Sequence, residues 1–312
     1  MHRPRSRIGV LIVHGIGSQP AGYSRRMQAA LCGALGRAAP RFVLQEVLWS
    51  KVLWQVEDEL LARMREARDP SGAVLPLGWN RLREFIVHGF ADALAYHRGM
   101  QSTSLYVEVH DAVSVSVRAL RETLDDPDAP IVVLAHSLGA HVMSNYVWDT
   151  EPAPVHLPNC DGSDQLDGAE PPHPAAPASS SRWEPIPTLT AVITFGSNIP
   201  LFSLAVDLAE PIVLPAAGVV DARLRELARW LNFYDSADVL GGPLRSLYTP
   251  DLDRMHCARR NTVARIEDRA IDAGWFPANH TPLSHSLYWT EAQLIQPVAA
   301  YLRSLAEALP PR

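Results

Sequence analysis

The sequence has few cysteines, no excess of positive charge and no long apolar run. Its three cysteines (Cys32, Cys160 and Cys257) are scattered and odd in number, so we expect a reducing compartment and no disulfide framework. The formal net charge is −6 over 312 residues, which gives no reason to expect nucleic acid as a partner. No apolar stretch reaches the roughly 20 residues that span a membrane. These features favour a cytoplasmic protein without integral membrane contact and leave its oligomeric state unknown.

Spacing also argues against a secretion signal, a dinucleotide and a metal. The basic residues before Ile8 are followed by an apolar stretch that ends at Val13, which is too short for a signal peptide. Gly15 and Gly17 follow this stretch, but the dinucleotide fingerprint requires a third glycine where Pro20 stands. Neither the cysteines nor the histidines have the spacing of zinc ligands. We therefore expect no cofactor and no metal.

Strand and helix patterns alternate along most of the chain. Apolar runs typical of buried strands occupy residues 8–13, 42–48, the segment from 131, 189–195, 230–234 and 262–266. Helical patterns occupy 24–37, 105–124, the segment from 139, 223–229 and 290–305. This alternation predicts an α/β fold with a mostly parallel central sheet and helices on both faces.

Two segments depart from that alternation within what we expect to be one domain, 1–312. Residues 51–100 contain two amphipathic stretches, which either form a helical cap over a site or simply cover the sheet. Residues 151–187 are rich in proline, serine, alanine and acidic side chains. Such a composition buries little apolar surface, so we expect a flexible surface insertion.

Ser137 is the first candidate for a functional side chain. The apolar run from Ile131 breaks at Ala135-His136-Ser137-Leu138-Gly139, and a helical pattern follows. A serine in such a strand-to-helix turn adopts a tense backbone geometry that projects its hydroxyl from the sheet. Small residues on both sides, here Ala135 and Gly139, let the strand and the helix pack closely. The pattern predicts a nucleophile elbow.

A serine nucleophile needs a base and a carboxylate that orients the base. Asp238 follows the strand at 230–234 and is our predicted acid, and Asp235 is its rival, more typical of a turn former. His285 precedes the last predicted helix and is our predicted base, with His280 as the close competitor and His256 as a distant one.

Acyl chemistry also requires N–H donors for the negative oxygen that develops on the substrate. The N–H of Leu138 is expected to be one donor, because it follows the nucleophile at a helix N-terminus. The N–H of Ile16 is expected to be the other. His14, Gly15 and Gly17 would support it, since glycines let the backbone approach the substrate, although they also suit a simple tight turn.

With His14-Gly15, the Ser137 pentapeptide, Asp238 and His285 in this order, the chain resembles the α/β-hydrolase superfamily, most closely its lipase- and esterase-type serine hydrolases. The resemblance covers nearly the whole chain except 151–187. It implies a carboxylic ester or thioester substrate and an acyl-Ser137 intermediate, with no cofactor. Two alternatives stay open: a non-catalytic binding or scaffold protein with this fold, and transfer of the acyl group to an acceptor other than water.

Overall fold

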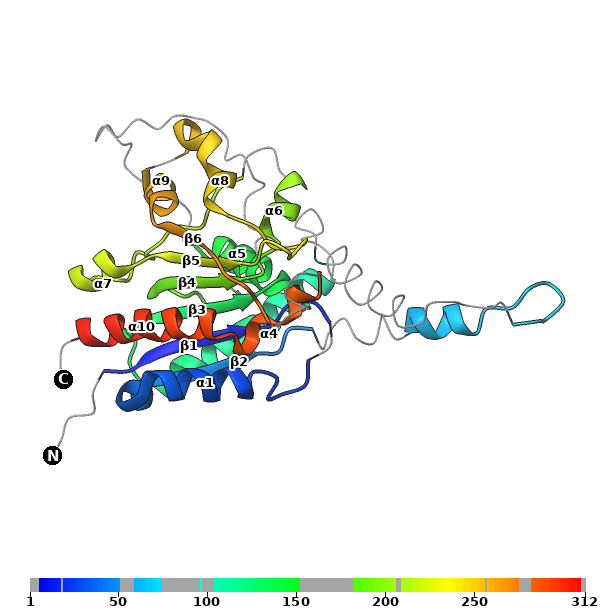
Figure 1. Ribbon diagram of the computed structural model, residues 1–312, viewed down its shortest axis with the longest axis horizontal. Coiled ribbons are helices and arrows are strands. Elements are labelled where there is room, and N and C mark those ends of the chain that lie inside the picture. Colours follow the sequence, from blue (N-terminus) through cyan, green and yellow to red (C-terminus); the bar gives the residue numbers. More distant parts are fainter. Residues whose placement is uncertain are drawn as a thin grey trace.

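A six-stranded parallel sheet forms the centre of the molecule (Figure 1). The computed structural model describes residues 6–17, 19–50, 59–74, 96, 104–151, 182–205, 209–255, 257–274 and 282–309. The spatial order of the strands is β2-β1-β3-β4-β5-β6, and every pairing is parallel. The strands are β1 (Ile8–Val13), β2 (Phe42–Val47), β3 (Ile131–His136), β4 (Leu189–Phe195), β5 (Trp230–Tyr234) and β6 (Ile266–Ala270). The predicted α/β fold class is confirmed.

Helices cover both faces of the sheet, as predicted. They are α1 (Arg25–Leu35), α4 (Ser104–Leu124), α5 (Leu138–Thr150), α6 (Ile199–Phe202), α7 (Ala222–Leu227), α8 (Arg245–Tyr248), α9 (Cys257–Ala264) and α10 (Ala292–Ala308). Short 3-10 turns occupy Gly36–Arg41, Ser203–Ala205, Thr249–Arg254, Pro282–Ser286 and Tyr288–Thr290. Figure 1 shows α1 and α10 together along one face. Among the described residues, no helix combines the length and the apolar character needed to cross a bilayer.

Alternate side chains of the central strands enter two separate cores. On β1, Ile8, Val10 and Ile12 face the core under α1 and α10, whereas Leu11 and Val13 face the core under α4 and α5. All five are fully buried. A strand buried on both faces reads as a continuous apolar run, which is why the sequence revealed β1, β3 and β4 so clearly.

The last strand lies later in the chain than predicted. Of the residues predicted as strand at 262–266, the first three form the end of α9, and β6 begins at Ile266. The hydroxyl of Thr262 donates to the carbonyl oxygen of Ala258 in the preceding turn and accepts from the N–H of Leu214. β6 is an edge strand that carries Glu267 and Arg269, whose side chains form an ion pair. Edge strands commonly carry charged side chains. A prediction based on apolar residues therefore placed this strand too early in the chain.

The segment 151–187 also differs from the prediction at its end. Trp183 and Ile186 are buried, and Trp183 donates from Nε1 to Asp111 on α4. Residues 182–187 are therefore packed against the body, while 152–181 lie outside the described residues. Most of the predicted cap at 51–100 also lies outside them, apart from a helix at 59–65, the turn that follows it and the buried Tyr96. The cap and the single-domain organisation stay predictions.

The expectation of a reducing compartment with no disulfide framework does not account for Cys257. This residue is disulfide-bonded, whereas Cys32 is free and exposed. An odd and scattered set of cysteines does not exclude one disulfide.

The order of the strands sets where a ligand would meet the sheet. β1 pairs with β2 on one side and with β3 on the other, so the chain reverses its direction of winding there. In open α/β sheets, ligands bind at the carboxyl ends of the strands beside such a switch point. The loops after β1 and β3 carry His14 and Ser137.

Candidate active site

Ser137 occupies a strained turn between β3 and α5. Its φ of 50° and ψ of −126° are unusual for a residue with a side chain. The N–H of Ser137 donates to the carbonyl oxygen of Phe195 at the end of β4, over 3.1 Å. Backbone strain of this kind is retained where the surrounding structure holds it, and such positions cluster at functional sites.

Glycine at position 139 is required by close packing below this turn. A Cβ atom there would lie 2.2 Å from the carbonyl oxygen of His14, far inside van der Waals contact. Gly15 is equally constrained, because its Cβ would lie 2.7 Å from Cβ of Ser137. The loop after β1 and the turn after β3 are therefore in direct backbone contact.

The structure brings Ser137, His285 and Asp238 together in one hydrogen-bonded chain. Nε2 of His285 lies 2.8 Å from Oγ of Ser137, and Nδ1 lies 2.9 Å from both carboxylate oxygens of Asp238. Because the carboxylate can only accept, Nδ1 carries the proton, and Nε2 is left to accept from the serine hydroxyl. All three side chains are buried.

Asp238 is held by several donors besides His285. Oδ1 accepts from the backbone N–H groups of Leu240 and Gly241, and Oδ2 accepts from the hydroxyl of Tyr288 over 2.8 Å. Burial alone would raise the pKa of Asp238, but the hydrogen bond and charge of His285, followed by the donors at Leu240 and Tyr288, outweigh it and lower the pKa. The carboxyl is therefore ionised at neutral pH.

Asp235, the rival acid, has a different set of contacts. Its carboxylate accepts from the backbone N–H groups of Ala237 (2.7 Å) and Ala273 (2.5 Å). These bonds tie the turn after β5 to the segment after β6. The rival histidines His256 and His280 lie outside the described residues.

Two residues of this site were missed by the sequence reasoning. Tyr288 donates to Asp238 and accepts from the N–H of Asp235. His136, the residue before Ser137, lies within hydrogen-bond distance of the carbonyl oxygen of His285. Tyr288 follows His285 by less than one helical turn, and that proximity was the only signal in the sequence.

The loop after β1 is stiffened by His14. Nδ1 of His14 donates to the carbonyl oxygen of Gly15 over 2.8 Å, and the ring stacks on Trp49, whose Nε1 donates to the carbonyl oxygen of His14. Burial lowers the pKa of His14 to about 4, so the ring is neutral. Ile16, two residues after His14, is partly buried against the core under α4 and α5. Whether Ile16 and Leu138 serve as oxyanion donors stays a prediction.

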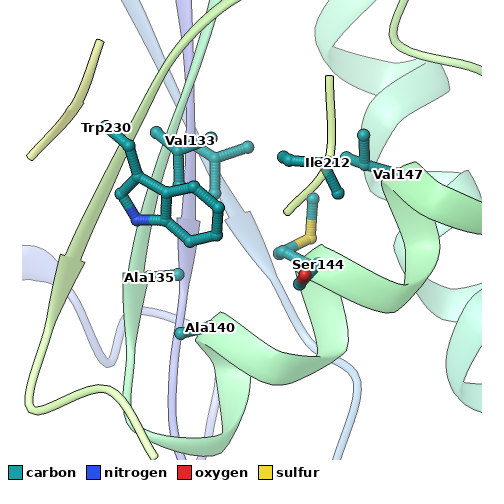
Figure 2. A pocket seen from close by; sticks show the side chains of 9 residues that line it. Val133, Ala135, Ala140, Ser144, Val147, Ile212 and Trp230 are labelled. Atoms are coloured by element: carbon teal, nitrogen blue, oxygen red, sulfur yellow. The ribbon is translucent and has the colours of Figure 1, made fainter. Parts of the chain in front are cut away.

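A small apolar cavity lies between α5 and the sheet (Figure 2). Its walls include Val133 and Ala135 of β3, Ala140 and Val147 of α5, and Trp230 of β5. Its free volume of about 10 Å³ holds no more than about one water molecule. The cavity is a gap in the core and is too small for an acyl group.

No protein-family model and no curated protein matches the chain. One solved structure, from work on "LipS and LipT, two metagenome-derived lipolytic enzymes", covers 99% of this chain and 96% of its own, at 12% sequence identity and a TM-score of 0.32. A likeness this weak carries no argument about fold, substrate or mechanism, so the proposed function depends on the site geometry.

Proposed function

We propose that the protein is a serine hydrolase that cleaves carboxylic ester or thioester bonds through an acyl-Ser137 intermediate. The observation that carries the proposal is the bonded chain from Oγ of Ser137 through His285 to Asp238, with distances of 2.8 and 2.9 Å. In this arrangement the imidazole can take the serine proton, and the carboxylate stabilises the imidazolium that forms.

In the first half of the reaction, Oγ of Ser137 attacks the substrate carbonyl carbon and its proton moves to Nε2 of His285. The carbonyl oxygen becomes an oxyanion, for which we propose the N–H groups of Leu138 and Ile16 as donors. The intermediate collapses when the bond to the leaving group breaks. The alcohol or thiol leaves with the proton from His285, and the acyl group remains on Ser137.

In the second half, His285 takes a proton from water, whose oxygen attacks the acyl carbon. Collapse of the second oxyanion breaks the bond to Oγ, which regains the proton, and a carboxylic acid is released. His285 is the proton acceptor or the proton donor in every step, so the cycle needs no reactant besides the ester and water.

A fluorophosphonate probe tests this proposal, because its phosphorus forms a bond to an activated serine oxygen as fluoride leaves. The wild type should be labelled at Ser137 and should hydrolyse short p-nitrophenyl esters. Ser137→Ala should do neither. Ser144→Ala is the matched control, since Ser144 lies on α5 at the small cavity, and it should react as the wild type does.

The same experiment separates the alternatives. A non-catalytic scaffold would give neither labelling nor ester turnover in the wild type, and labelling that survives in Ser137→Ala would reject the nucleophile. An acyltransferase would be labelled at Ser137 but would release p-nitrophenol slowly until an alcohol or amine acceptor is added, which then leaves with the acyl group as an ester or amide. The cytoplasmic location stays a prediction, and the disulfide at Cys257 argues against the reasoning that led to it.

A further inference from the structure

His136 makes a long-range hydrogen bond to the backbone of the proposed base. It is the last residue of β3, its side chain is buried, and its Nε2 lies 2.8 Å from the carbonyl oxygen of His285. A carbonyl oxygen can only accept, so Nε2 of His136 must carry the proton. The two residues are 149 positions apart in the chain.

The opposite edge of the same ring faces the loop after β1. A Cβ atom on Gly15 would lie 2.9 Å from Nδ1 of His136. Burial, with a smaller effect from the charge of His285, lowers the pKa of His136 to about 3, so the ring is neutral at pH 7. With its proton on Nε2, a neutral ring has a lone pair at Nδ1. The ring thus bridges the loop after β1 and the turn that carries His285.

The turn that carries His285 needs such an anchor. It is a 3-10 turn of five residues, Pro282–Ser286. The last carbonyl groups of a short helical turn have no partner within it, so they depend on donors from elsewhere. A donor at the carbonyl of His285 restrains the backbone from which the imidazole projects toward Ser137.

We propose that His136 is a positioning residue, which holds His285 against Ser137 through the Nε2–H bond to the carbonyl oxygen of His285. The inference rests on the proposed function, since it concerns the same site. His136 touches neither Oγ of Ser137 nor the substrate in this role. It acts through the backbone of the base, where a displacement of about 1 Å is enough to slow a reaction by about 10².

Packing offers a different explanation that must be tested against this one. The ring of His136 lies 5.1 Å from that of Phe195 and 5.4 Å from that of Trp289, centroid to centroid. Two substitutions separate the explanations. His136→Phe keeps an aromatic ring and removes the donor, whereas His136→Gln loses the ring and keeps an N–H donor of similar reach.

The measurement is the kcat and KM of each variant on a short p-nitrophenyl ester, with the labelling rate by fluorophosphonate and the Tm. If His136 positions the base, His136→Phe loses about 10² in kcat and in labelling rate, with KM within about threefold of wild type. His136→Gln then recovers at least about tenfold of that loss. If packing alone matters, the glutamine variant is the slower of the two, or both match the wild type, and the inference is overturned.

A second readout does not depend on activity or on the variants folding. The ¹⁵N shifts of the His136 ring in the wild type at pH 7 should indicate a neutral ring protonated at Nε2. A ring protonated at Nδ1, or at both nitrogens, would overturn the inference. If the wild type neither reacts with the probe nor turns over ester, the proposed function fails, and the tautomer alone then decides whether the hydrogen bond exists.

Discussion

Replacing Gly139 by alanine would place a methyl carbon 2.2 Å from the carbonyl oxygen of His14. To reach ordinary contact, either α5 or the loop after β1 must move by roughly 1 Å. Both are held firmly: His14 directly follows the central strand β1 and its carbonyl accepts from Nε1 of Trp49 over 3.0 Å, while α5 packs on the sheet. Overpacking of this kind costs about 1–3 kcal/mol, and we expect the upper end.

Thermal unfolding checks that value against a matched control. For a chain of this size, a loss of about 3 kcal/mol lowers the Tm by about 5 °C. Gly33 is an exposed glycine within α1, and a Cβ atom built there meets no other atom within 4 Å. Gly33→Ala should therefore raise the free energy of unfolding by up to about 1 kcal/mol, so its Tm should equal or exceed that of the wild type.

The same displacement should weaken catalysis, because Gly15 and Ile16 would move relative to Ser137. We expect the kcat of Gly139→Ala on a short ester to fall by about 10² while Gly33→Ala retains wild-type activity. Equal Tm values for Gly139→Ala and wild type, with equal activity, would refute the reasoning, since the clash would then be relieved at no cost.

The hydrogen bonds around Asp238 lead to two further predictions. Tyr288→Phe removes the donor to Asp238 and the acceptor for the N–H of Asp235, so urea unfolding should reveal a loss of about 2 kcal/mol at pH 7. The folded-state pKa of Asp238 is lowered, so the stability from its carboxylate is present above the unfolded pKa of about 3.9 and is lost as the pH falls through the folded value. The difference in free energy of unfolding between Tyr288→Phe and wild type should therefore become smaller below about pH 4. A difference that stays constant with pH would contradict the hydrogen bond from Tyr288 to the ionised Asp238. Asp238→Asn should lower kcat by about 10⁴, because an amide favours the wrong tautomer of His285. Asp235→Asn should instead reduce stability and leave the kcat of the folded enzyme within about tenfold of wild type; an equal loss of kcat in both variants would mean that the acid was wrongly chosen.

The parts of the fold that could be predicted are those in which one local pattern has one structural meaning. The buried runs that became β1, β3 and β4 are apolar on both faces, and their boundaries agree with the prediction. The helix at 105–124 was predicted correctly because a parallel connection requires a crossover. Conversely, β6 was misplaced, because an edge strand with Glu267 and Arg269 lacks the apolar signal on which the prediction depended.

The residues of the candidate active site also differ in how far the sequence could predict them. Ser137 was found from local sequence, since an elbow needs a strand, a small residue and a helix in succession. Asp238 and His285 could be proposed only from their order, and their contact with Ser137 follows from the fold. The roles of His136 and Tyr288 could not be predicted, because their hydrogen bonds join segments far apart in the chain.

The distance between Ser137 and Asp238 is set by strand register as much as by the loops that carry these residues. His136 of β3 is level with Phe195 of β4, and Phe195 is level with Phe233 of β5. The turns after β3 and β5 therefore leave the sheet at nearly the same height. A one-residue slip of any of these strands would exchange its two faces and move apolar side chains out of both cores. The alternation that fills the two cores is consequently the same feature that holds the serine and the carboxylate at opposite sides of one imidazole.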